Sequence, residues 1–425
     1  MHRFLLVLAC LLFAGYSFAE NIVLHVGTLL AIPGQAPLSN QTVIIRENKI
    51  VEVLDGFVDA PPDAITLDLR DHFVLPGLMD MHVHLLIELG VDATGRQLKE
   101  SSAFGVLRGV ANAQKTLLAG FTSVRDLGGN PESIYAIRDA ISANLISGPR
   151  VFAAGSALAA TGGHGDIDAV RPELMRIWTP ETICDGKVAC RKATRHAIKY
   201  GADWIKITAT GGVLSDTSTG LGVQMTDGEL AEIVSTAHNL GIKVAAHAHG
   251  TDGINAALRA GVDSVDHGTF LDRGSIKLFK SKKAFLVSTL MPGHYVPLSM
   301  EGNPFFTGAI KAKALLAAEH SKSGFAIAEK AGVKIAFGTD TGVTPHGQNA
   351  KEFSLMVNAG MSPGQAIRSA TVVSSELLGL SDRLGTLEVG KLADIIAVKG
   401  DPLHDISLLE HVTTVIKDGR IEKRL

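Results

Sequence analysis

The chain has 425 residues, of which 46% are hydrophobic and 20% charged, so it can bury a large core and is not a disordered or low-complexity protein. Its length accommodates a barrel of about 250 residues together with one accessory domain. The formal net charge of -3, without a clustered run of Lys and Arg, gives no electrostatic basis for binding nucleic acid. The expected partners are therefore small molecules and further copies of the chain.

The first residues have the features of a secretory signal peptide, which predicts removal of residues 1–19 and a secreted or periplasmic mature protein. His2 and Arg3 make a short basic start, an apolar run follows, and small residues precede the expected cleavage after Ala19. The apolar run of about a dozen residues is shorter than the ~20 that a membrane-spanning helix needs, which argues against a permanent anchor. We therefore expect no membrane attachment after signal removal.

Short alternating apolar segments at both ends of the remaining chain predict a small β-sandwich domain, built from residues 20–73 and 382–425. Turn residues such as Pro33-Gly34 separate the segments. The expected strands are 22–26, 41–45, 49–53, 393–398 and 412–416.

Residues 74–381 alternate apolar runs with Ala-rich stretches, a rhythm typical of repeated βα units. Eight such units favour an α/β fold with a closed (β/α)8 TIM barrel over an open doubly wound sheet, and an early Gly-x-Gly-x-x-Gly turn for a dinucleotide is missing. The expected strands begin near residues 74, 121, 151, 204, 244, 264, 285 and 335. The expected helices include 102–119, 190–200, 227–240, 253–260 and 309–331.

Two cysteines remain after signal removal, Cys184 and Cys190, and they lie six positions apart. In an oxidising compartment such a pair can close a small disulfide loop, which we favour. Two free thiols are the alternative. A zinc site is less favoured, because no second Cys or His pair with ligand spacing lies close by.

Polar residues recur where the expected strands end, and in such a barrel these ends share one open face that carries the catalytic groups. His82 and His84 alternate along an extended strand, so both imidazoles point to the same side. Lys206 lies among apolar neighbours, where an unpaired ammonium would be costly. The complete ordered set is His82, His84, Lys206, His247, His267 and Asp340.

This set, together with segments 75–84 and 390–396, resembles the amidohydrolase superfamily from about residue 22 to the C-terminus. The resemblance implies two divalent metal ions, zinc by default, with manganese or cobalt as substitutes. It implies that His82, His84 and Asp340 hold the more buried ion, that His247 and His267 hold the more exposed one, and that a carboxylated Lys206 bridges both. Asp340 is then also the catalytic base that passes a proton to the leaving nitrogen.

Further residues on the same face are candidates for substrate binding. His164, in a Thr-Gly-Gly-His-Gly loop, is expected to act in catalysis by contacting the substrate carbonyl or the oxyanion, while Tyr295 and the backbone near Gly212 bind a substrate carboxylate. His249 either orients His247 or contacts the substrate. Except for His164, a purely structural role for these residues is an equal alternative.

Segments 161–165 and 205–212 resemble the imidazolonepropionase-related branch, which includes Xaa-Pro dipeptidases, carboxypeptidases acting on N-acyl amino acids and ochratoxin-degrading amidases. The resemblance implies a binuclear amidohydrolase that cleaves dipeptides or N-acyl amino acids and forms a symmetric homo-oligomer, with an octamer as one candidate. A lactonase and an imidazolonepropionase-like hydrolase of cyclic amides are the alternatives. A non-catalytic scaffold is disfavoured because all six ligand positions are retained.

Overall fold

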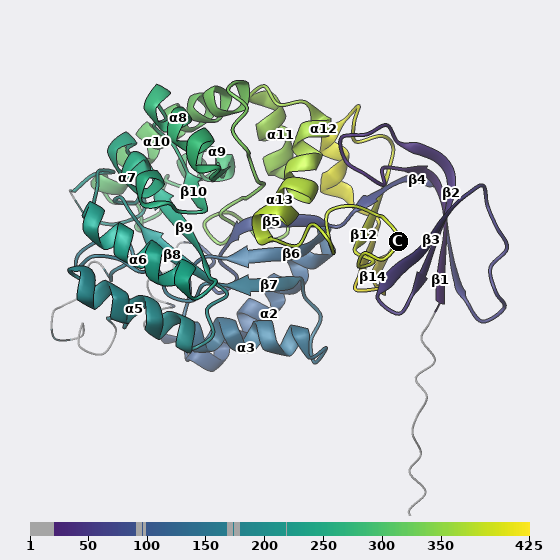
Figure 1. Ribbon diagram of the computed structural model, residues 1–425, viewed down its shortest axis with the longest axis horizontal. Helices are drawn as coiled ribbons and strands as arrows, with labels where there is room; N and C mark the ends of the chain where they lie inside the picture. Colours follow the sequence, from purple (N-terminus) through teal and green to yellow (C-terminus); the bar gives the residue numbers. More distant parts are fainter. Residues whose placement is uncertain (1–20, 91–95, 97–98, 168–172, 174–178, 218) are drawn as a thin grey trace, which may run out of the picture.

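The computed structural model describes residues 21–425 except 91–95, 97–98, 168–172, 174–178 and 218, so the expected signal peptide lies outside the described residues. The fold is mixed α/β. Figure 1 shows a sheet-rich part, built from both ends of the chain, beside a part in which strands and helices alternate. None of the described helices combines the length and the hydropathy needed to cross a bilayer.

Strands from both chain ends are hydrogen-bonded into one seven-stranded sheet, in the order β14-β13-β12-β4-β1-β2-β3. The central strand β4 pairs parallel with β1 and antiparallel with β12, which joins the two ends of the chain. The two chain ends therefore build one sheet-rich part together, as the sequence predicts. Its strands are β1 (Asn21–Leu29), β2 (Leu38–Arg46), β3 (Lys49–Asp55), β4 (Ile65–Pro76), β12 (Ile395–Lys399), β13 (Thr414–Lys417) and β14 (Arg420–Arg424).

The alternating part contains two parallel sheets, one of three and one of four strands. The three-stranded sheet contains β5 (Leu78–Val83), β6 (Phe121–Asp126) and β7 (Arg150–Ala153). The four-stranded sheet contains β8 (Trp204–Thr208), β9 (Lys243–Ala248), β10 (Ser264–His267) and β11 (Phe285–Val287). Isolated parallel bridges join Leu158 to Ile207, Leu286 to Ile335 and Val83 to Thr341. These bridges connect the two sheets at both sides, and the segment 335–341 leads from β11 back to β5.

Six of the expected strand starts coincide with β6 to β11, and the other two differ. Val74 belongs to β4 of the chain-end sheet, and the first strand of the parallel part is β5. Gly77 lies between β4 and β5, where the backbone passes close to Thr122. A side chain would not fit at this position, because its Cβ would lie 2.4 Å from Thr122 Oγ1. Ile335 forms a single bridge instead of a regular strand.

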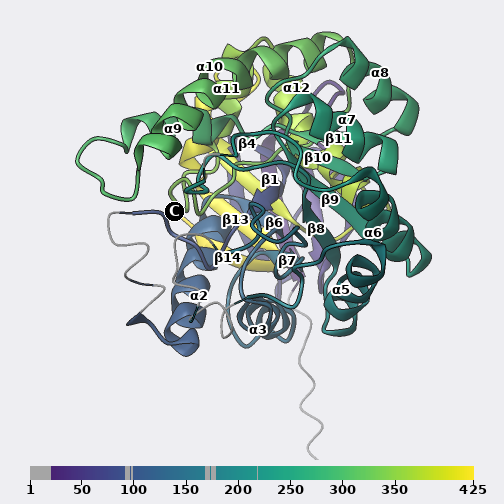
Figure 2. The ribbon, with the colours of Figure 1, turned by 90° about the vertical axis from the view of Figure 1, so that its left-hand side faces the viewer.

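The expected helices correspond closely to α2 (Ser102–Leu118), α5 (Lys187–Lys199), α6 (Asp227–Asn239), α7 (Thr251–Ala260) and α10 (Gly308–Lys330). Figures 1 and 2 show α5, α6 and α7 on the outer side of β8 to β10, as expected for helices that connect parallel strands. The other helices are α3 (Pro131–Ser142), α8 (Arg273–Lys282), α9 (Leu290–Leu298), α11 (Lys351–Asn358), α12 (Pro363–Arg368) and α13 (Ser374–Leu378), with a π-helical turn at Ser369–Val373 and a 3-10 turn at Ile406–His411.

The disulfide between Cys184 and Cys190 is present and joins the segment before α5 to its first turn. Cys184 also donates its backbone N–H to Ala159 O at 2.9 Å, and the carboxylate of Asp185 accepts from Thr161 Oγ1 at 2.6 Å. The disulfide therefore holds the segment that supports residues 159–161, directly before the loop that carries His164.

Candidate metal centre and catalytic site

The predicted ligands come from distant segments and meet at the carboxyl ends of the parallel strands. They surround one cavity of about 540 Å³. His82 lies on β5, Lys206 on β8, His247 on β9 and His267 at the end of β10. His84 and Asp340 lie in the loops that follow β5 and the 335–339 segment.

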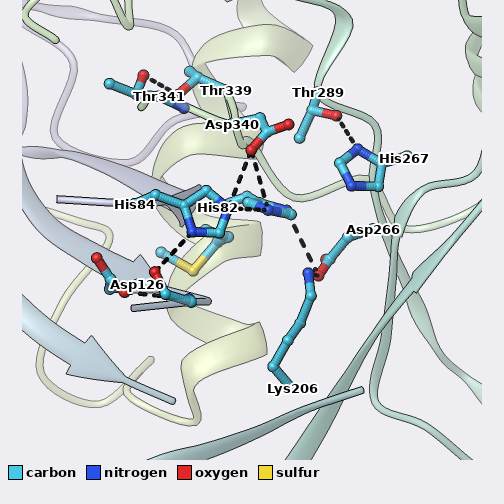
Figure 3. A network of polar contacts seen from close by, with 12 residues as sticks. His82, His84, Asp126, Lys206, Asp266, His267, Thr289, Thr339, Asp340 and Thr341 are labelled. Carbon is cyan, nitrogen blue, oxygen red and sulfur yellow. Dashed lines mark hydrogen bonds and ion pairs between the residues drawn. The ribbon is translucent and has the colours of Figure 1, made fainter. Parts of the chain in front are cut away.

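His82, His84 and Asp340 form the first group of possible metal donors, with all donor atoms within 4.8 Å of one another. Oδ1 of Asp340 lies 3.2 Å from Nε2 of His84 and 3.5 Å from Nε2 of His82 (Figure 3). The two Nε2 atoms are 3.3 Å apart. Two imidazoles and a carboxylate that converge in this way can hold a divalent ion.

The buried carboxylate of Asp80 fixes this group by joining β5 to the segment that carries Asp340. It accepts hydrogen bonds from the backbone N–H groups of His82 and Thr339, both at 3.1 Å, and from Nδ2 of Asn349 at 2.8 Å. Asp340 itself adopts a left-handed backbone with φ of 56°. A strained conformation of this kind is typical of residues held in place for function.

His247, His249 and His267 form the second group, also within 4.8 Å. Nδ1 of His249 lies 2.7 Å from Thr269 Oγ1, and Nδ1 of His267 lies 2.7 Å from Thr289 Oγ1. These contacts leave the Nε2 atoms of both rings as possible donors. His249, expected to orient His247 or to contact the substrate, thus lies within the donor group itself.

Lys206 is buried, and its Nζ donates to Oδ2 of Asp266 at 2.9 Å (Figure 3). Oδ1 of Asp266 accepts from Nη2 of Arg125 at 3.0 Å, so two cations share one buried carboxylate. Burial lowers the pKa of Lys206. Because the charged ammonium is disfavoured here, the amine is a better nucleophile than an exposed lysine at the same pH.

Most of the clustered histidines are neutral at neutral pH. Burial lowers the pKa of His82, His247 and His267 well below the usual value and that of His249 to about 3. His84 differs, because the hydrogen bond and charge of Asp340 outweigh burial and raise its pKa. Neutral imidazole is the form that binds a metal ion, so the environment of the cluster favours metal binding.

His164 lines the cavity beside His247, with ring centroids 4.4 Å apart. Its Nδ1 lies 2.7 Å from Ser215 Oγ, and its backbone N–H donates to Gln224 Oε1 at 2.8 Å. Gly212 packs directly under the ring, since a Cβ there would lie 2.1 Å from Nδ1. Burial lowers the pKa of His164 to about 4, so its ring is neutral near pH 7 and can donate one hydrogen bond and accept another.

Two of the predicted substrate contacts, Tyr295 and Gly212, make hydrogen bonds within the protein. Tyr295 is not among the described residues that line the cavity, and its hydroxyl donates to Gln348 Oε1 at 2.6 Å. Gly212 supports His164 and accepts from Lys313 Nζ at 3.0 Å through its carbonyl, while the neighbouring residues 213 and 214 face the cavity.

Sequence reasoning missed the supporting residues Asp80, Asp266 and Glu352. Asp80 lies two positions before His82, and Asp266 directly precedes His267. Their position beside predicted ligands could have identified them as supporting residues. Glu352 is fully buried and accepts the backbone N–H groups of Leu290 and Met291, both at 2.8 Å, at the start of α9. It lies far in sequence from any motif, so no local pattern marks it.

Comparison with known proteins adds three relatives. Residues 73–421 match the profile of the Amidohydrolase family. Ochratoxinase of Aspergillus niger is 32% identical over 436 residues, covering 97% of this chain and 89% of that protein. A Xaa-Pro dipeptidase solved with methionine bound in the active site has a TM-score of 0.88 and 40% identity, covering 95% of this chain and 99% of that one. A prolidase complexed with N-methylphosphonate-L-proline has a TM-score of 0.87 and 32% identity, covering 96% and 100%.

Proposed function

Because the chain belongs to the amidohydrolase family and is a hydrolase acting on amide C–N bonds, we propose that it is a metal-dependent enzyme that cleaves dipeptides or N-acyl amino acids. The observation that carries this proposal is the meeting of two possible donor groups, His82/His84/Asp340 and His247/His249/His267, in one cavity beside Lys206. Both groups consist of buried or half-buried nitrogen and oxygen donors, which suit zinc and similar divalent ions.

In this proposal His82, His84 and Asp340 hold the more buried ion, and His247 and His267 hold the other. His249, in the same group, is a further donor for the second ion. When bound, the two ions supply an activated water near neutral pH and polarise the scissile carbonyl. The remaining tasks fall to the chain's own residues.

Asp340 is proposed to carry the proton. Its Oδ1 already approaches both imidazoles of the first group, so its other oxygen is available to accept a proton from water and to pass it to the leaving nitrogen.

His164 is proposed to bind the substrate carbonyl through a hydrogen bond. If the Ser215 hydroxyl donates to Nδ1, the ring hydrogen resides on Nε2, where it can donate to the developing oxyanion.

Lys206 is proposed to be carboxylated and to bridge both ions. Carboxylation replaces a buried ammonium by an anionic ligand with two oxygens, which removes the cost of burying the cation. The nitrogen of the modified side chain retains one N–H, which still suits Oδ2 of Asp266. Asp266 also keeps its pairing with Arg125, so the surrounding hydrogen bonds tolerate the change.

The test is a screen of dipeptides and N-acyl amino acids with metal-loaded protein, alongside a metal analysis of the protein as purified. We expect two metal ions per chain and release of a free amino acid. A lactone assayed in parallel tests the alternative of ester hydrolysis, and failure on every amide would favour it. Purification without metal, together with inactivity after zinc loading, would favour a scaffold.

We further propose that residues 78–381, from β5 onward, form a complete (β/α)8 barrel, and that residues 20–76 and 382–425, with the whole of β4, form the accessory domain. We also propose that the mature chain assembles into a homo-oligomer after export. The bridges that connect both sides of the two parallel sheets support the barrel. N-terminal sequencing of the exported protein, with Glu20 expected as its first residue, tests the export. Light scattering in solution tests the oligomer.

A further inference from the structure

The cavity lined by the histidines also has an apolar wall. This apolar wall comes from the loops after β5 and β8, from α9 and the segment before α10, and from the turn after Asp340. It consists of Leu89, Val213, Leu214, Val296, Phe305 and Val343.

The apolar wall is backed by tightly buried side chains. Five of its six residues pack against a cluster that includes Met300, Phe306, Ile310 and Ala314. Val296 itself is 4% exposed and belongs to that cluster. A wall supported in this way is already formed before a substrate enters, which is the usual state of a small-molecule pocket.

The loops after β6 and β7 give the cavity a mixed lining. Polar groups and glycine backbone, from Gly128, Gly129, Ser156, His164 and Gly165, stand there beside a few apolar side chains such as Leu127 and Ile167. Asp166 lines this side too, but its carboxylate accepts the backbone N–H groups of Gly162 and Ile167, each at 2.8 Å. It is therefore engaged in holding its own loop.

The two kinds of lining suit different halves of an amino-acid amide. The leaving amino acid carries a carboxylate, which is costly to bury against aliphatic side chains and is better accommodated beside the polar groups of the loops after β6 and β7. The acyl half is then left to the apolar wall. A free ammonium on that half would meet Leu214, Val296 and Phe305 instead of a carboxylate.

We propose that the acyl half of the substrate is a bulky, uncharged apolar group seated on the apolar wall, so that the enzyme prefers N-acyl amino acids over dipeptides with a free amino group. This specificity presupposes the proposed amide hydrolysis and narrows its substrate class.

The sharpest test compares two compounds that differ only in the ammonium group. L-leucyl-L-proline and 4-methylpentanoyl-L-proline have the same scissile bond, the same leaving amino acid and the same branched chain. With the metal-loaded enzyme, we expect kcat/KM to be about 100-fold higher for the acyl compound, as for a buried charge left without a partner. Equal or faster cleavage of the dipeptide would overturn the proposed specificity.

A binding measurement separates this inference from the proposed function. If neither compound is cleaved, the proposed amide hydrolysis is refuted for such substrates. Calorimetric titration then still measures whether the apolar wall binds the acyl compound more tightly than the dipeptide. Tighter binding of 4-methylpentanoyl-L-proline would then support the apolar site, and equal or weaker binding would refute it.

Two variants connect the preference to the wall. Phe305→Ala is expected to lower kcat/KM for 4-methylpentanoyl-L-proline about 10-fold and to leave N-acetyl-L-proline nearly unchanged, because the short acyl group does not reach the ring. Leu214→Asp, at a half-buried position, supplies a carboxylate and is expected to shift the ratio about 10-fold toward the dipeptide. The control is Leu298→Ala, on the same helix α9 but 72% exposed, which should alter neither ratio. Unchanged ratios in both wall variants would refute the assignment.

Discussion

Nζ of Lys206 lies 2.9 Å from Oδ2 of Asp266, and both side chains are almost completely shielded from solvent. Arg125 approaches the other oxygen of the same carboxylate at 3.0 Å. Asp266 can therefore lose its contact with Lys206 without becoming a buried, unpaired charge. Because of this arrangement, we expect that Lys206 can be carboxylated or replaced while the surrounding strands keep their packing.

Replacement of Lys206 by alanine should abolish turnover and reduce bound metal below two ions per chain, while the protein stays folded. The reason is that the proposed bridging ligand disappears but Asp266 remains paired with Arg125. Metal content by mass spectrometry, together with circular dichroism, measures both effects. Lys280→Ala, which removes a surface contact to Ala331 O, is the control. Retained activity in the Lys206 variant would contradict the two-metal scheme.

Carboxylation of Lys206 makes a separate prediction for the unaltered protein. Metal-free protein reconstituted with zinc in buffer free of carbon dioxide should regain little activity, and added bicarbonate should restore it. Burial lowers the pKa of Lys206, which favours the uncharged amine, the form that reacts with carbon dioxide. Full recovery without bicarbonate would indicate an unmodified lysine.

The contact between Ser215 and His164 should affect kcat more than KM. Ser215→Ala removes the partner of Nδ1, so both tautomers of the ring become populated and the donor at Nε2 is present only part of the time. We expect kcat to fall about 10-fold, against about 100-fold or more for His164→Ala. Ser215→Thr, which keeps the hydroxyl, is the matched control. Steady-state kinetics decide, and a pure KM effect would place His164 in substrate binding only.

Much of the fold was predictable because it depends on local patterns. The alternating apolar runs at the chain ends correspond to β1, β2 and β3, and the capping sequence at Thr226 marks the start of α6. The meeting of the six candidate ligands around one cavity was predictable as well. Strand ends in a βα repeat share one face, and residues at positions i and i+2, such as His82 and His84, point the same way.

Long-range contacts could not be read from the sequence. Val74 belongs to an apolar run of the kind expected for a barrel strand. It pairs instead with Ala397 in the chain-end sheet, more than three hundred residues away in the sequence. Tyr295 follows the seventh strand as expected, but the direction of its side chain is set by α9, whose packing against α11 no local motif reveals. Glu352 was missed for the same reason.

Loss of the disulfide should weaken the region around His164. Replacing Cys184 and Cys190 by serine is expected to lower the free energy of unfolding by about 2 kcal/mol, as for a short closed loop. The contacts from Cys184 and Asp185 to residues 159 and 161 should also loosen, so that kcat falls while bound metal is unchanged. Denaturant unfolding, metal analysis and kinetics test this. Unchanged kcat would show that the loop keeps its position without the disulfide.

Glu352 should make stability depend on pH in the direction opposite to most carboxylates. Burial raises the pKa of Glu352 to about 8, whereas an exposed glutamate titrates near 4.5. Between these values the folded state binds more protons than the unfolded state, so this group's contribution to stability declines as pH rises from about 4.5 through 8. The nearby carboxylates of Asp80 and Asp340 act in the same direction.

Glu352→Gln removes this titration but offers only one oxygen to the two N–H groups at the start of α9. The variant should therefore be about 1 kcal/mol less stable than the unaltered protein at pH 5, because one hydrogen bond is lost. The difference should shrink and then reverse toward pH 9, since the variant has no buried carboxylate to ionise. Urea unfolding of both zinc-saturated proteins across this pH range measures the pH at which their free energies of unfolding become equal. Glu376→Gln, at a largely exposed ion pair with Lys334, is the control and should give curves parallel to those of the unaltered protein. Parallel curves for Glu352→Gln as well would mean that the glutamate is ionised throughout and acts only as a fixed cap on α9.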